Sequence, residues 1–264
     1  MKPFNFRLTV FLWVVLTTCI TAQTNQITLE EIWGGAFRTE RLDALRSLKS
    51  GTEYAVLNYD RQLKASTIDV YDYASGEKVR TMANTADLMD ISYIISYSLS
   101  EDESKVLLSA ELQQIYRRSS RGKYLVLDVE KKTTLPVSNN MIQEPTFSPD
   151  GSMVAYGYNN DLYIKDLVKD QVTQVTNDGE KNAIINGITD WVYEEEFGFV
   201  RAFDWNANSD KIAYRSTSNG SEVAIRLILS RSAPAGLPTR SATIKSSSSA
   251  SVCWKFVIES TLEE

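Results

Sequence analysis

The chain has 264 residues, of which 43% are apolar and 23% are charged, as is usual for a soluble globular protein with a buried core. Its net charge of −6 is unevenly distributed, because residues 215–264 hold six basic and four acidic side chains and residues 1–22 add Lys2 and Arg7. The segment between them is therefore acidic. This excludes nucleic acid as an expected partner, since phosphates need a basic surface.

The first 22 residues are typical of an export signal. Lys2 and Arg7 precede the apolar stretch Leu8–Leu16, and Thr21-Ala22 supplies small residues for cleavage. We predict a signal peptide over 1–22 and a protein that is periplasmic, extracellular or held at the membrane by this end. An uncleaved anchor is one alternative, although the apolar stretch is short for a bilayer, and lipidation of Cys19 is another.

The sequence contains no histidine. A Ser-His-Asp relay needs an imidazole to carry the proton, and the commonest zinc sites also use histidine. Neither a G-x-S-x-G elbow nor a G-x-G-x-x-G phosphate loop is present. We therefore expect no catalytic residues, no metal and no cofactor in this chain.

A unit made of a turn and a strand recurs along the chain, which predicts a repeat fold. The best copy is Phe147–Gly151 followed by Met153–Tyr156, and similar units precede and follow it. The other copies are Lys49–Gly51 before Glu53–Val56, Leu99–Asp102 before Lys105–Leu108, and Trp205–Ser209 before Lys211–Tyr214.

Three of these units are followed by a second strand that ends in an acidic turn, over 68–72, 124–128 and 162–166. A period near fifty residues matches one four-stranded blade of a β-propeller. We predict an all-β fold with about four blades over 23–214. A β-sandwich is the alternative, but it does not explain the repeated turn.

The pattern changes after Tyr214. From Val223 to Lys255 there is no acidic residue, and Ser246–Ser249 is a run of serines. We predict that 215–264 is an irregular tail. It is either a disordered segment or the product of a shift in the reading frame shortly after Tyr214.

Three adjacent glutamates, Glu194, Glu195 and Glu196, follow Tyr193. Such a run is usually a solvated face. Here apolar residues flank it, and carboxylates held against an apolar wall repel one another, so at least one is expected to have a raised pKa unless a cation binds. A site of this kind favours a ligand ammonium.

The run Asn186–Glu196, with the sequence NGITDWVYEEE, resembles the double-glutamate motif of the dipeptidyl peptidase IV family of serine exopeptidases. The similarity extends through most of 27–214 and includes FSPDG at 147–151, NNDLYIKD at 159–166 and the pair Tyr116-Arg117. It implies an eight-bladed propeller, of which this chain holds about half, with the glutamates on a short helical insertion.

The resemblance also implies roles for individual residues. Glu195 and Glu196 would bind the α-ammonium of a peptide substrate, Glu194 would position the helix, and Tyr193 lies with them in the motif. Arg117 would contact the substrate carbonyl and steady the glutamates. Fixing the amine at a set distance from a nucleophile would limit the product to a dipeptide, with proline or alanine in second place.

The chain departs from that family in one respect. The family carries its serine, aspartate and histidine in an α/β-hydrolase domain after the propeller, and nothing here resembles it. We expect an inactive substrate-binding portion. The alternatives are a non-catalytic propeller that binds peptide amino termini or a protein partner, and a structural propeller whose glutamates lie on the surface. Family members are often homodimers, and the oligomeric state here stays open.

Overall fold

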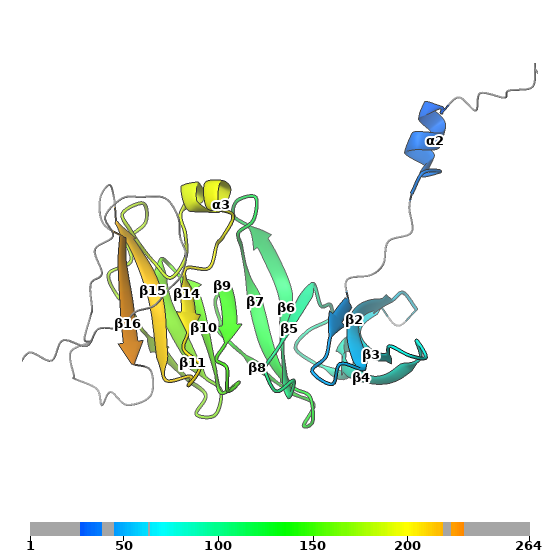
Figure 1. Ribbon diagram of the computed structural model, residues 1–264, viewed down its shortest axis with the longest axis horizontal. Coiled ribbons are helices and arrows are strands. Elements are labelled where there is room, and N and C mark those ends of the chain that lie inside the picture. The colour runs from blue at the N-terminus through cyan, green and yellow to red at the C-terminus, as the bar shows by residue number, and fades with distance from the viewer. Residues whose placement is uncertain (1–26, 39–44, 63, 219–222, 230–264) are drawn as a thin grey trace, which may run out of the picture. The chain divides into compact units, whose positions relative to one another are not determined.

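A computed structural model describes residues 27–38, 45–62, 64–218 and 223–229. They form antiparallel β-sheets, two short α-helices and one 3-10 turn (Figure 1). The chain divides into two compact units, Met1–Asp43 and Ala44–Glu264. The first contains helix α2, Leu29–Gly34, which begins with a capping box between Thr28 and Glu31.

Four sheets of four strands make up the second unit, and we call them blades 1 to 4 in chain order. The fold is a partial β-propeller with sheets that do not close on one another, as the sequence predicted. Blade 1 has β1 Leu45–Ser47, β2 Glu53–Asp60, β3 Ala65–Asp72 and β4 Lys78–Asn84, followed by the turn η1 Thr85–Asp87. Blade 2 has β5 Ser96–Leu99, β6 Lys105–Gln114, β7 Ser120–Asp128 and β8 Thr133–Pro136. Blade 3 has β9 Gln143–Phe147, β10 Met153–Tyr158, β11 Asp161–Asp166 and β12 Gln171–Gln174. Blade 4 has β13 Ile184–Asn186, β14 Phe203–Trp205, β15 Lys211–Ser218 and β16 Val223–Leu229, with helix α3 Trp191–Phe197 between β13 and β14.

The repeated unit found in the sequence is one closed turn in the structure. In blade 3 the backbone N–H of Ser148 donates to Met153 O at 2.9 Å, and Gly151 has a φ of +64°. The left-handed residue lets the chain reverse before the next strand. The same closing bond joins Leu48 to Glu53, Ser100 to Lys105 and Asn206 to Lys211.

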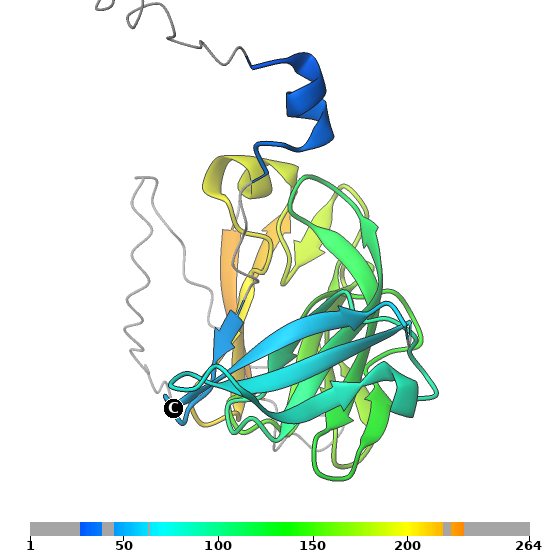
Figure 2. The ribbon, with the colours of Figure 1, turned by 90° about the vertical axis from the view of Figure 1, so that its right-hand side faces the viewer.

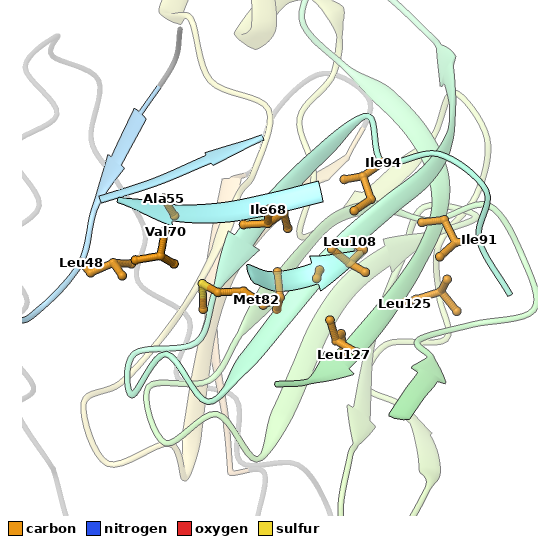
Figure 3. Packing of buried hydrophobic residues seen from close by; sticks show 12 residues of the cluster. Leu48, Ala55, Ile68, Val70, Met82, Ile91, Ile94, Leu108, Leu125 and Leu127 are labelled. Atoms are coloured by element: carbon orange, nitrogen blue, oxygen red, sulfur yellow. The ribbon is translucent and has the colours of Figure 1, made fainter. Parts of the chain in front are cut away.

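The side chains of each strand point alternately to its two faces, and this explains how a blade packs against both of its neighbours. In β6, Val106 and Leu108 belong to the core shared with blade 1, whereas Leu107 lies in the core shared with blade 3. Successive residues of a strand point to opposite faces, so a strand in a stacked sheet is apolar on both sides. Figure 3 shows the first of these cores, where Ile68 and Met82 of blade 1 lie near Leu108 and Leu127 of blade 2.

Two of the predicted segments extend outside the described residues. The predicted signal peptide at 1–22 lies entirely outside them, as do residues 219–222 and 230–264 of the predicted tail. The predicted boundary at 214 falls within β15, and β16 pairs with that strand from Lys211 to Thr217. Among the described residues, no helix has the length and apolarity needed to cross a lipid bilayer.

Candidate functional site

The glutamates lie on an excursion of blade 4. β14 pairs with Ile212–Tyr214 and β13 pairs with Ser216–Ser218, while β16 pairs with both of these stretches of β15. β13 and β14 must therefore lie end to end along the edge of β15 opposite to β16. Residues 187–202, which include α3, leave the sheet between them and return.

Local sequence signals explain the helix. Asp190 is the N-cap, and its side chain accepts a hydrogen bond from the backbone N–H of Tyr193 at 2.9 Å. Gly198 ends the helix with a φ of +74°, a conformation that glycine adopts without strain. In both ribbon views α3 lies beside the loop that joins β6 to β7 (Figures 1 and 2).

Glu194 is the buried member of the three, with 1% of its surface exposed. Its Oε1 accepts hydrogen bonds from the backbone N–H groups of Arg118 and Ser119, the second at 2.9 Å. Burial by itself would raise the pKa of Glu194, but the hydrogen bonds from Ser119 and Arg118 outweigh it and hold the pKa below its ordinary value. The raised pKa expected for at least one of the three glutamates is not found at Glu194, because these donors stabilise its charged form.

Glu195 faces the same loop. Its Oε2 lies 3.6 Å from Nη1 of Arg117, and the Glu195 side chain is 21% exposed while that of Arg117 is 75% exposed. Glu196 is exposed, and no ion pair joins it to the residues that the structure describes. The structure thus brings Arg117, Glu194 and Glu195 together and leaves Glu196 open to solvent on the same helix.

Tyr193 is half-buried, and its ring contacts Phe197 at 5.1 Å and Phe199 at 6.0 Å between centroids. The apolar wall expected around the glutamates is only partly formed. Trp191, Val192 and Phe197 are exposed by 55%, 49% and 59%. A helix of seven residues has one buried face, and in α3 Glu194 occupies that face.

Arg215 contributes to the site although the sequence gave no reason to select it. Its Cζ lies 3.4 Å from the centroid of the Tyr193 ring, and the residue is 9% exposed. It lies in β15, directly opposite the point where the excursion begins and ends. Only the register of β13, β14 and β15 reveals this position, so no sequence motif could have marked it.

The described residues contain no group of three or more histidine, cysteine, aspartate or glutamate side chains placed to hold a metal ion. The chemistry available at α3 is that of carboxylates. Glu195 and Glu196 carry two negative charges and Arg117 supplies one positive charge beside Glu195. The fold and the site together define a partial β-propeller with a helical excursion that carries Glu194, Glu195 and Glu196 beside the β6–β7 loop.

Comparison with known proteins gives the family. Residues 100–236, just over half of the chain, match the model of the dipeptidyl peptidase IV N-terminal region. The chain therefore belongs to the dipeptidyl peptidase IV family and carries part of its N-terminal propeller region, as the resemblance in the sequence implied.

Individual relatives agree with this assignment. The chain is 30% identical to prolyl endopeptidase FAP of Bos taurus over 208 residues, which are 76% of this chain and 26% of that protein. It is 36% identical to dipeptidyl peptidase 4 of Bos taurus over 135 residues, covering 50% and 18%. The crystal structure of Porphyromonas gingivalis dipeptidyl peptidase 4 superposes with a TM-score of 0.66 at 34% identity, covering 73% of this chain and 28% of that one. The chain thus spans about a quarter of the length of the first of these relatives and of the crystal structure.

Proposed function

We propose that this chain is the substrate-binding portion of an exported serine exopeptidase that releases dipeptides from peptide amino termini, with proline or alanine as the second residue. Glu195 and Glu196 bind the protonated amine. The observation that carries the proposal is the arrangement of charges on α3. Arg117 pairs with Glu195 at 3.6 Å, whereas Glu196 on the same helix is exposed and has no ion pair with a described residue, so its carboxylate is open to a ligand ammonium.

The chemistry suits a peptide amino terminus. An α-amino group has a pKa of about 8 and is largely protonated at neutral pH. Hydrogen bonds between charged groups contribute about 1.5–3 kcal/mol each, so two carboxylates fix both the position and the charge of the ligand. An acetylated amino terminus has no positive charge and one N–H, and it loses most of this interaction.

Binding a peptide does not require the residues that would hydrolyse it. Because this chain contains no histidine, we propose that it binds such peptides without cleaving them through a Ser-His-Asp relay. The second candidate is a non-catalytic propeller that binds peptide amino termini. Both candidates predict binding, and both differ from a propeller whose glutamates lie on the surface without a ligand.

Calorimetric titration of the full chain with glycyl-proline amide and with its N-acetylated form tests the proposal. We expect the free amine to bind at least tenfold more tightly. Glu195→Gln and Glu196→Gln should each remove most of that difference, whereas Glu130→Gln, an exposed glutamate of blade 2, should leave it unchanged. Equal affinity for the two peptides in the folded wild-type chain would refute amine recognition.

A further inference from the structure

The backbone of Arg215 forms hydrogen bonds at both ends of the excursion, residues 187–202. Gly187, where the chain leaves blade 4, donates its N–H to Arg215 O at 2.9 Å. Arg215 in turn donates to Ala202 O at 2.8 Å, where the chain returns, and Ala202 donates to Gly187 O at 2.9 Å. One residue of β15 therefore holds both ends of the segment that carries α3.

The side chain of the same residue reaches the helix. Its guanidinium carbon lies 3.4 Å from the ring centroid of Tyr193, a distance at which the two planar groups are in contact. Nε of Arg215 is buried and has no hydrogen-bond partner among the described residues. Leaving a buried donor of a charged group without an acceptor is costly, and the aromatic face of Tyr193 is the favourable contact that the structure shows for this guanidinium.

This stack is adjacent to the carboxylates. Tyr193 directly precedes Glu194, which is anchored to the β6–β7 loop, and Glu195, which faces Arg117. Fixing the Tyr193 ring therefore restrains the rotation and tilt of a helix that has only seven residues. Glu194 restrains α3 from blade 2 and Arg215 restrains it from blade 4.

We propose that Arg215 is a positioning residue of the amine-binding site, which it serves by stacking on Tyr193 and so fixing the direction in which Glu195 and Glu196 point. This inference rests on the proposed function for its effect on ligand binding. Its effect on the order of α3 does not depend on any ligand. Arginine is required because its planar guanidinium covers the ring, whereas the ammonium of lysine is a compact, strongly hydrated charge.

Two measurements on the full chain test the proposal. Calorimetry gives the affinity for glycyl-proline amide, and hydrogen–deuterium exchange gives the protection of the Arg118 and Ser119 amides, which Glu194 binds only when α3 is in place. For Arg215→Met we expect at least tenfold weaker binding and at least tenfold faster exchange at these amides. Arg215→Lys should retain the charge and still show most of both changes.

Tyr193→Leu removes the aromatic ring on which Arg215 stacks. It therefore tests the same contact if an Arg215 variant does not fold. It should accelerate exchange at the same two amides, and combining it with Arg215→Met should add little further change. Arg46→Met is the matched control, because Arg46 lies over the Tyr97 ring at 5.3 Å in another part of the propeller. It should alter neither measurement.

The outcomes separate the two ideas. If folded Arg215 variants melt at a lower temperature but keep wild-type affinity and wild-type exchange at Arg118 and Ser119, Arg215 is only structural and the inference is overturned. If the wild-type chain does not distinguish the free amine from the acetylated peptide, the proposed function fails. The exchange data then decide alone whether Arg215 positions α3.

Discussion

The carboxylate of Glu194 accepts a hydrogen bond from the backbone N–H of Ser119, 75 residues earlier in the chain, at 2.9 Å. Glu194 belongs to the excursion of blade 4, and Ser119 lies in the loop between β6 and β7 of blade 2. Blade 3 separates these blades in the chain and shares a hydrophobic core with each of them. A single buried side chain therefore joins two blades that are not neighbours, and it places Arg117 beside Glu195.

Replacing this carboxylate should loosen the contact between the blades. Glu194→Ala leaves the N–H groups of Arg118 and Ser119 without their acceptor, which costs about 1–3 kcal/mol for a buried donor. We expect a loss of that size in the free energy of unfolding, measured by urea titration. We also expect faster hydrogen exchange at Ser119.

The conservative variant and a control make the reason clear. Glu194→Gln keeps an acceptor oxygen of similar size and should lose less stability than Glu194→Ala. Glu77→Ala, at an exposed glutamate after β3, should change the free energy of unfolding by no more than about 0.5 kcal/mol. Equal stability of Glu194→Ala and Glu77→Ala would contradict the bridging role of Glu194.

The repeat of turns could be predicted from sequence because each copy is a local feature. Ser148-Pro149-Asp150-Gly151 specifies a reversal by its own residue types, and β-branched and aromatic residues follow in the strand. The helix of the glutamates was also predictable from the family resemblance, and Asp190 and Gly198 are the usual signals for its ends.

The burial of the individual glutamates could not be predicted in this way. The residue types of three adjacent glutamates do not indicate which one faces the protein, and only the family resemblance singled out Glu194 as the residue that would position the helix. The structure buries Glu194 because the loop at Arg118 and Ser119 supplies two backbone donors, and those donors come from a distant blade. Arg215 was missed for a similar reason, since its position depends on the register of three strands.

Arg117 should affect ligand binding more than stability. Arg117 itself is largely exposed and its guanidinium lies 3.6 Å from Glu195, so Arg117→Met should change the free energy of unfolding by less than about 1 kcal/mol. If its guanidinium also contacts the substrate carbonyl, the affinity for glycyl-proline amide should fall about tenfold, the equivalent of ~1.4 kcal/mol.

Butylamine provides the control for Arg117, because it has an ammonium but no carbonyl. Its affinity should not fall in Arg117→Met, since the variant removes a positive charge beside the carboxylates. Calorimetric titrations of both ligands check this difference. A parallel loss of affinity for the two ligands would show that Arg117 acts only by holding Glu195 in place.

Asp69 in β3 should make the protein sensitive to acid. Burial would raise its pKa, but Lys78 at 2.7 Å and hydrogen bonds from Thr81, Asn58 and Thr67 lower the pKa from 3.8 to about 2. Because the folded pKa is depressed, the stabilisation is present above the unfolded pKa and is lost as the pH falls from about 4 to about 2.

The depressed pKa of Asp69 sets the size of its contribution to the free energy of unfolding. A shift of this kind in a partly screened group contributes about 1–2 kcal/mol at neutral pH. Asp69→Asn should lose this amount at pH 7 and show a flatter decline in stability between pH 4 and pH 2, as urea unfolding at several pH values would measure. Asp87→Asn, at an exposed aspartate of η1, should keep the wild-type pH dependence. If Asp69→Asn lost stability between pH 4 and pH 2 as steeply as the wild-type chain, Asp69 would not be the group responsible for that loss.

Gly122 in β7 allows the hairpin that carries Arg117 to close. A Cβ at this position would lie 2.3 Å from the backbone oxygen of Glu111 and 2.6 Å from a methyl carbon of Leu112. The backbone oxygen cannot move without breaking the β6–β7 pairing, so Gly122→Ala should destabilise the protein by about 1–3 kcal/mol in thermal or urea unfolding. Gly34→Ala in α2 has no atom within 4 Å of the added carbon and should cause no such loss. Similar unfolding free energies for the two variants would mean that the hairpin adapts without cost.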